Sequence, residues 1–135
     1  AIIVADAYNH RIRKIDSNGE VSTIAGSTGG YADGTGTNAQ FNGPNGVAID
    51  NDGAIIVVDI GNHLIRKIDN NGYVTTIAGS LYFYFPGYSG NSDGIGRNAQ
   101  FWYPKGVVID NYGSIIVVDG GNNRIRKMKF GYLNH

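Results

Sequence analysis

The chain has 135 residues, enough for one domain with a hydrophobic core, and its 11 basic and 11 acidic residues give a formal net charge of zero. That balance gives no overall attraction for nucleic acid or anionic membrane surfaces, and no apolar run reaches the roughly 18 residues of a membrane helix. The absence of cysteine excludes disulfides, thiolate metal sites and cysteine nucleophiles. The 21 glycines and nine tyrosines are typical of a turn-rich all-β protein, and on this composition we expect an extracellular location.

Short runs of β-branched and apolar residues recur along the chain, and we name them strands a to d in the order of one repeat. The first unit, residues 1–40, contains runs b, c and d, the second contains all four, and the third contains a, b and c. In the second unit these runs are Gly46–Asp50, Ile55–Asp59, Leu64–Ile68 and Tyr73–Ile77. Strand b is apolar at every position before its final aspartate, which predicts burial of Val57 and its counterpart Val117 between neighbouring sheets.

The turns between these strands predict hairpins. Each is a four-residue segment that starts with aspartate and ends with a glycine able to take positive φ: Asp16–Gly19, Asp50–Gly53, Asp69–Gly72 and Asp110–Gly113. The spacing leaves no room for helices. Four consecutive antiparallel strands that recur at a period above 50 residues are typical of the blades of a β-propeller.

The repeat also resembles a known family. Its pattern is Pro-x-Gly-Val-x-Ile-Asp, then Ile-x-Val-x-Asp-x-x-Asn-x-x-Ile-Arg-Lys, then Val-x-Thr-Ile-Ala-Gly, complete over Pro44–Gly79 and partial over Ile2–Gly26 and Pro104–Met128. This pattern resembles the NHL repeat. The resemblance implies a toroid, commonly of six blades, in a family whose members mostly bind protein or RNA and of which a minority are enzymes.

The strands present make about two and a half blades. We expect one NHL-like segment over residues 1–135, comprising a blade without strand a (1–40), a complete blade with an aromatic loop insertion (41–100), and a blade without a full strand d (101–135). A ring of six four-stranded blades needs roughly 24 strands. Open strand edges invite association, so the missing strands would come from a longer chain or from other copies.

Two polar motifs recur with the strands. Asp-x-x-Asn stands at Asp6/Asn9, Asp59/Asn62 and Asp119/Asn122, and we expect it to form local hydrogen bonds rather than a ring of metal ligands. Strand c supplies eight of the 11 cations, namely Arg11, Arg13, Lys14, Arg66, Lys67, Arg124, Arg126 and Lys127. We expect a solvated face whose arginines pair with the strand b aspartates, rather than a nucleic-acid stripe.

His10 and His63 occupy the same register in adjacent units, on loops expected at one face of a propeller, and are candidate binding residues. The third unit has Asn123 instead, so a third ligand for a shared metal is missing. We predict neither a metal nor a cofactor.

The segment that does not repeat is aromatic. The second linker between strands d and a is longer than the first, and it brings candidate binding residues Tyr82, Phe83, Tyr84, Phe85 and Tyr88, followed by Trp102 and Tyr103. Two interpretations stay open: the aromatics fold back over the seam between blades, or they form a contact surface for a partner.

The predicted function is a non-catalytic binding or assembly module for protein–protein contacts. Its partner would be protein, either other copies of itself or the rest of a longer propeller chain. The alternatives are a propeller enzyme of the lyase or lactonase type, or an RNA-binding NHL module. Similar amidating lyases hold zinc through histidines near the starts of inner strands, where Phe41–Pro44 and Phe101–Pro104 contain none, so we predict no catalytic residues.

Overall fold

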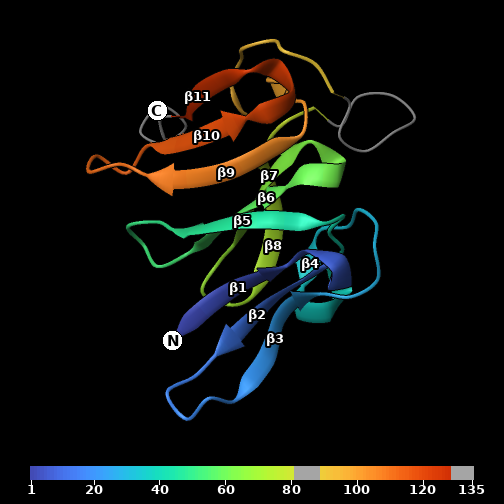
Figure 1. Ribbon diagram of the computed structural model, residues 1–135, viewed down its shortest axis with the longest axis vertical. Coiled ribbons are helices and arrows are strands. Elements are labelled where there is room, and N and C mark those ends of the chain that lie inside the picture. Colours follow the sequence, from blue (N-terminus) through green and yellow to red (C-terminus); the bar gives the residue numbers. More distant parts are fainter. Residues whose placement is uncertain (81–88, 129–135) are drawn as a thin grey trace.

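The computed structural model describes residues 1–80 and 89–128. In these residues the strands form three antiparallel sheets, and the helices are single 3-10 turns. The first sheet has the order β1-β2-β3, with β1 at Ile2–Asp6, β2 at Arg11–Ile15 and β3 at Val21–Gly26. The sheets follow one another along the long axis of the molecule (Figure 1).

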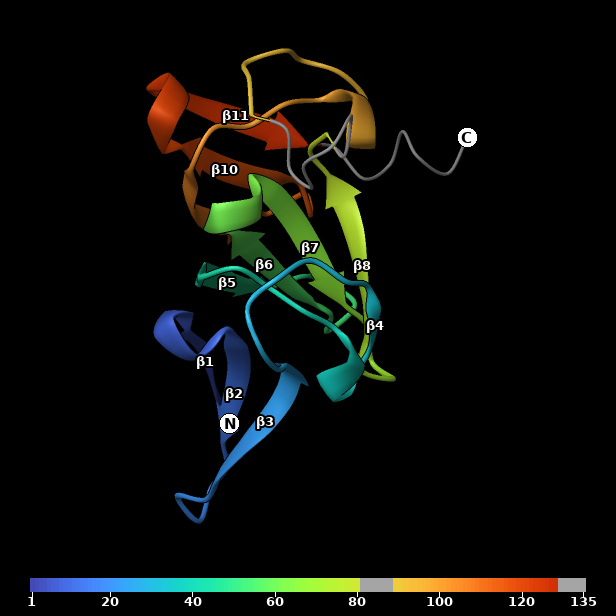
Figure 2. The same cartoon turned by 90° about the vertical axis from the view of Figure 1, so that its right-hand side faces the viewer.

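The second sheet is the most complete. It has the order β4-β8-β7-β6-β5, with β5 at Pro44–Ile49, β6 at Ile55–Asp59, β7 at Leu64–Ile68 and β8 at Tyr73–Ala78. The short β4, Gly34–Thr35, comes from the preceding linker and pairs with the outer edge of β8 (Figure 2). Strand β4 was not predicted from the sequence, and it adds residues from before position 41 to the second sheet.

The third sheet has the order β11-β10-β9, with β9 at Pro104–Ile109, β10 at Ile115–Asp119 and β11 at Arg124–Met128. All-β architecture with antiparallel blades, about two and a half of them, is therefore confirmed. None of the helices in the described part of the chain is long and apolar enough to cross a membrane.

A one-turn 3-10 helix follows strand b of every blade. These turns are η1 (Ala7–Asn9), η3 (Ile60–Asn62) and η5 (Gly120–Asn122), and each ends at a residue in the left-handed conformation, His10, His63 or Asn123. The linkers add η2 (Gly36–Asn38) and η4 (Gly96–Asn98). The asparagine of each Asp-x-x-Asn motif is thus held one turn away from its aspartate.

The hydrophobic core lies between the sheets. One cluster joins the first blade to the second and includes Ile12, Phe41 and Val57, and the other joins the second to the third and includes Val58, Phe101 and Val117. Val57 and Val117 are fully buried, as predicted for strand b. Phe41 and Phe101, which stand at the ends of the two linkers, are each buried in one of these clusters. Each therefore fixes the position of its linker between two blades.

Candidate functional site

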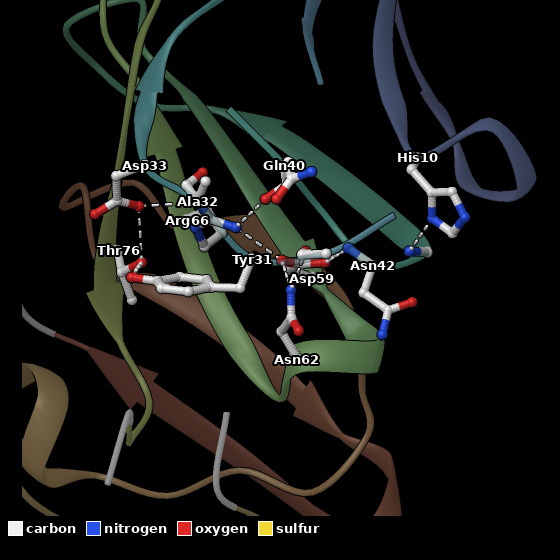
Figure 3. A network of polar contacts seen from close by, with 12 residues as sticks. His10, Tyr31, Ala32, Asp33, Gln40, Asn42, Asp59, Asn62, Arg66 and Thr76 are labelled. Carbon is white, nitrogen blue, oxygen red and sulfur yellow. Dashed lines mark hydrogen bonds and ion pairs between the residues drawn. The ribbon is translucent and has the colours of Figure 1, made fainter. Parts of the chain in front are cut away.

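The largest buried side chain of the described residues is an arginine. Arg66 on β7 has no exposed surface and directs its guanidinium into the linker that precedes its own blade (Figure 3). Nη1 donates to Asp59 Oδ2 and to the carbonyl of Gln40, both at 2.9 Å, while Nη2 donates to the carbonyl of Ala32 at 2.8 Å and to Asp33 Oδ1 at 2.9 Å. Planar, charge-assisted bonding of this kind suits arginine and not lysine. A β-bulge lies between Ile65 and Arg66, and bulges of this kind change the direction in which the adjacent side chain points.

Aromatic rings complete the Arg66 cluster. The guanidinium carbon lies 4.8 Å from the centroid of the Tyr31 ring and 5.0 Å from that of Phe41. The Tyr31 hydroxyl is 3.1 Å from Thr76 Oγ1, which also hydrogen-bonds Asp33 Oδ1 at 3.1 Å (Figure 3). The cluster therefore ties the linker, β7 and β8 together with cation–π contacts in addition to hydrogen bonds.

Asp59 compensates the charge of Arg66. Its carboxylate also accepts the backbone N–H of Asn42 at 2.7 Å and Nδ2 of Asn62 at 2.8 Å, and the same Asn62 amide donates to the carbonyl of Gly30. Burial raises the pKa of Asp59, and the charge of Arg66 and the donors around the carboxylate oppose that shift. Three donors and an opposite charge are what a fully buried carboxylate requires.

The third blade repeats the cluster with less burial. Arg126 on β11 donates to Asp119 at 2.8 Å, to Asp93 at 2.6 Å, and to the carbonyls of Gln100 and Ser92 at 3.0 Å each. The side chain of Asp93 is 93% exposed. This linker is fastened to its blade in the same way, but one partner of the arginine lies in solvent.

The first blade contains only the local part of the cluster. Arg13 donates to Asp6 at 3.1 Å and Asn9 donates to the same carboxylate at 3.0 Å. The hydrogen bond from Asn9 and the nearby Arg13 charge hold the pKa of Asp6 below its usual value. Among the described residues, no preceding linker supplies this arginine with carbonyls or a second aspartate.

These contacts decide two of the sequence predictions. The hydrogen bonds expected for Asp-x-x-Asn and the pairing of each arginine with its strand b aspartate are confirmed. The prediction that strand c presents a solvated cationic face is wrong for Arg66, because the linker covers it completely. Within residues 1–80 and 89–128, no three His, Asp or Glu side chains are grouped so that they could hold a metal ion.

The two histidines contact the following blade and not each other. His10 Nδ1 accepts the backbone N–H of Gly43 at 3.0 Å, and His63 Nδ1 accepts that of Tyr103 at 2.9 Å. This geometry requires a neutral ring with its proton on Nε2. Burial lowers the pKa of His63, against an opposing effect of the Asp119 charge. Phe41–Pro44 and Phe101–Pro104 contain no histidine in sequence, yet the fold brings one to each from the neighbouring blade.

Trp102 and Tyr103 form an exposed aromatic pair beside His63. They are 46% and 48% exposed, their ring centroids are 6.4 Å apart, and the Tyr103 ring meets that of His63 edge-on at 4.5 Å. The backbone N–H of Gly121 donates to the carbonyl of Trp102 at 2.7 Å, which attaches the pair to η5. Of the predicted binding residues, the structure therefore groups Trp102, Tyr103 and His63, while His10 lies at the other seam.

The remaining aromatic candidates, Tyr82, Phe83, Tyr84, Phe85 and Tyr88, lie outside the described residues. Partner binding by any of the candidate residues stays a prediction.

Family models match two parts of the chain. The Teneurin NHL domain matches residues 29–89, and the NHL repeat matches residues 101–128. The chain belongs to the NHL-repeat β-propeller family. Among curated proteins, it is 48% identical over 80 residues to NHL repeat-containing protein 2 of Gallus gallus, an alignment that covers 58% of this NHL chain and 11% of that relative.

Solved structures agree with this assignment. A structural genomics protein of unknown function from Bacteroides thetaiotaomicron is 30% identical with a TM-score of 0.82, over 93% of this chain and 31% of that one. An auxiliary nutrient binding protein of the same species is 26% identical with a TM-score of 0.79, over 94% of this chain and 34% of that one. This NHL chain thus spans about a tenth of the curated relative and about a third of each solved neighbour.

Proposed function

We propose that this chain is a non-catalytic NHL propeller segment that binds protein, and that Trp102 and Tyr103 are the anchor of the contact. The first partner to test is a second copy of the chain. The contact lies at the end of the blades that carries η3 and η5, beside the seam between the second and third blades.

The observation that carries the proposal is the backbone conformation of Tyr103. Its φ is +47°, in the left-handed region, and the equivalent residue of the preceding repeat is Gly43, with φ +65°. A bulky side chain in this region costs on the order of 1–2 kcal/mol, a strain typical of functional positions. Trp102 likewise replaces Asn42 and is half exposed. Aromatic side chains that are strained and solvent-facing are well suited to form the core of a protein contact.

The charged groups of the repeat support a role without catalysis. The arginines of strand c donate hydrogen bonds to the buried aspartates and to linker carbonyls, so these charged groups are bonded within the fold. The name of the auxiliary nutrient binding neighbour adds support for a binding role, although that name belongs to the neighbour alone.

The third blade has an apolar face that is exposed in the described part of the chain, and a second copy or the next blade of a longer chain would cover it. Val118 and Ile125 are 42% and 68% exposed, whereas their counterparts Val58 and Ile65 in the second blade are fully buried against the third blade. Burial of such a face stabilises an assembly by roughly 25 cal/mol per Å² of apolar area.

The experiment replaces Trp102 and Tyr103 by their counterparts in the second blade, Asn42 and Gly43. Sedimentation equilibrium compares the wild-type chain with Trp102→Asn/Tyr103→Gly, which restores the Asn42–Gly43 pattern. We expect wild-type self-association and a dissociation constant at least about tenfold weaker in the double variant, because truncated aromatic anchors typically cost 2 kcal/mol or more. Stability should change by only about 1 kcal/mol, since loss of the His63 ring contact offsets relief of the strain.

The matched control is Tyr112→Asp. Tyr112 is an aromatic residue that is 92% exposed, in a hairpin turn whose counterpart in the second blade has Asp52, so this variant also reverts one repeat to the other. It should associate like the wild type. A wild-type chain that stays monomeric, or a double variant that associates as tightly as the control, contradicts the proposal.

A further inference from the structure

Two successive backbone amides at the start of the third blade are held from two different blades. The N–H of Trp102 donates to Asp119 Oδ1 of its own blade at 2.9 Å. The N–H of Tyr103 donates to Nδ1 of His63, which belongs to the second blade, also at 2.9 Å. The hydrogen bond of Tyr103 therefore crosses the seam between the blades, whereas that of Trp102 stays within one blade.

The preceding seam has the same arrangement. There the N–H of Asn42 donates to Asp59 Oδ1 at 2.7 Å, and the N–H of Gly43 donates to Nδ1 of His10 at 3.0 Å (Figure 3). The two histidines thus make the same bond at the two seams, but the residue that they hold is glycine at the first and tyrosine at the second. The bond at the first seam can therefore be removed without changing either member of the aromatic pair.

The backbone of His63 fixes the position of its ring. His63 ends η3 in the left-handed conformation, with φ 56° and ψ 40°, and its N–H donates to the carbonyl of Ile60. The ring meets that of Tyr103 edge-on, with centroids 4.5 Å apart. Asn123, at the same position of the third repeat, has φ 55° and ψ 42°. Asparagine therefore accepts this backbone conformation, and it has no proton to gain in the range where histidine titrates.

The bond from Tyr103 requires an unprotonated Nδ1 on His63. A neutral imidazole has an acceptor at one ring nitrogen, whereas the imidazolium has donors at both. A proton from solvent on Nδ1 would face the N–H of Tyr103 across 2.9 Å, and two donors at that distance repel each other. Tyr103 would then lose an acceptor while its φ is +47°, a conformation that a bulky residue keeps only where surrounding contacts hold it.

Trp102 is held by a different kind of group. Asp119, which accepts its N–H, is fully buried and pairs with Arg126 at 2.8 Å. The two members of the aromatic pair are thus attached through different chemistry, Trp102 through a buried ion pair and Tyr103 through the imidazole of His63. Loss of the imidazole bond alone would move Tyr103 relative to Trp102 and divide the pair.

The groups around the His63 ring set the pH at which it gains a proton. Burial lowers the pKa of His63, and the negative charge of Asp119 on β10 opposes that shift. Among the described residues, the other titratable group that faces the ring is Tyr103, the residue before β9. Because an ordinary histidine has a pKa of about 6.5, protonation of His63 requires a pH below about 6.5.

We propose that His63 is a pH-dependent positioning residue for the aromatic contact: its neutral ring fixes Tyr103 beside Trp102, and its protonation in acid releases Tyr103 and weakens the contact. The effect on the contact rests on the proposed function. Release of Tyr103 is a property of the single chain and can be measured without any partner.

Nuclear magnetic resonance of the 135-residue chain, at a concentration where it is monomeric, tests the release. The backbone amide of Tyr103 and the Cε1–H of His63 are followed between pH 7.5 and 5, and circular dichroism at each pH checks that the chain stays folded. We expect both signals to change with one shared midpoint, and the amide of Trp102 to change much less.

Two matched variants assign the effect. In His63→Asn, which introduces the residue of the third repeat, the amide of Tyr103 should lose this pH dependence. In His10→Asn, the same substitution at the first seam, the amide of Tyr103 should titrate as in the wild type.

Sedimentation equilibrium over the same pH range tests the effect on self-association. Each copy in a symmetric dimer contributes one His63, so the dissociation constant should rise up to about tenfold per pH unit for each histidine below the midpoint, or about a hundredfold in all. His10→Asn should show the same rise, and His63→Asn should lose most of it. Carboxylates that titrate at low pH affect both variants alike, so the difference between the variants reports His63.

Two results would overturn the proposal. One is an amide of Tyr103 that does not follow the titration of His63, because the imidazolium would then stay beside the tyrosine ring through cation–π attraction. The other is a wild-type dissociation constant that depends on pH no more than that of His63→Asn. A chain that is monomeric at every pH contradicts the proposed contact instead, and the amide titration then decides alone whether acid releases Tyr103.

Discussion

Replacement of the strand c arginines by methionine should lower the free energy of unfolding most for Arg66, less for Arg126 and least for Arg13. Arg66, Arg126 and Arg13 occupy the same position of the repeat and each faces the same aspartate of strand b. The substitution keeps most of the length and apolar contact of the side chain and removes the charge and its donors. Because the chemical change is identical, differences between the variants report the surroundings of each arginine.

The magnitudes follow from burial. The side chains of Arg66 and Asp59 are both 0% exposed, so Arg66→Met leaves an uncompensated buried carboxylate and should cost about 3–5 kcal/mol. The side chains of Arg13 and Asp6 are 30% and 27% exposed, and solvent screening reduces the cost of Arg13→Met to about 0–1 kcal/mol. Arg126, 9% exposed, should lie between them.

The assay is urea unfolding followed by far-ultraviolet circular dichroism. Domains of this kind have total stabilities on the order of 5–15 kcal/mol, so Arg66→Met removes a large share of the folding free energy. Arg66→Lys is the milder companion. It keeps the charge next to Asp59 but cannot reproduce the planar bonding to the linker carbonyls, and we expect a loss of about 1–3 kcal/mol.

The reasoning is refuted if the three methionine variants lose equal stability or if Arg13→Met loses the most. It is also refuted if Arg66→Lys is as stable as the wild type, because that result would mean that charge alone holds the linker.

Two further predictions concern His63 and the glycines of the second blade. Burial lowers the pKa of His63, whereas a histidine in the unfolded chain has a pKa of about 6.5 and takes up a proton more readily. The contribution of His63 to the free energy of unfolding should therefore stay level above about pH 6.5. Below that pH it should fall, by at most about 1.4 kcal/mol per pH unit. Urea titrations between pH 5 and 7.5 test this prediction. In His63→Asn, which introduces the residue found at this position in the third repeat, the loss of stability at low pH should be smaller. An unchanged loss of stability would mean that another group causes it. Gly79 has φ +102° and a Cβ there would lie 2.7 Å from the His63 carbonyl oxygen, whereas Gly72 has φ +82° and open space around it. Gly72→Ala should therefore cost about 1 kcal/mol and Gly79→Ala several, and equal melting temperatures of the two variants would contradict this difference.

The strands could be predicted from sequence because their determinants are local. Ile55–Asp59 and Leu64–Ile68 were predicted with the bounds that the structure shows, since β-branched runs between Asp-x-x-Gly turns leave little choice. In those turns the aspartate carboxylate accepts nearby backbone N–H groups, as Asp50 does from Asp52 and Ala54. Strand a was predicted two residues late, because Pro44 at its start resembles a turn residue.

The candidate site depended on contacts that sequence patterns do not encode. Arg66 reaches Ala32, Asp33 and Gln40, residues 34, 33 and 26 positions away, and only the return of the linker along the blade brings them together. A basic residue in a β-strand ordinarily indicates a solvated face. The one available signal was that Asp33 and Asp93 stand at equivalent places in two linkers that otherwise look like simple glycine turns.

The same contacts explain why identical motifs have different surroundings in one chain. Each Arg–Asp pair is completed by the linker that precedes its blade, and the linker is held on its other side by strand β8, through Thr76, in the second blade. The second blade has both the linker and that strand. Among the described residues, the third blade has the linker alone, and the first has its strand β3 but no linker that reaches Arg13. The burial of the arginine declines in the same order. The motif sequence sets the local hydrogen bonds, but the neighbouring segments set the dielectric environment of the charge pair and therefore its contribution to stability.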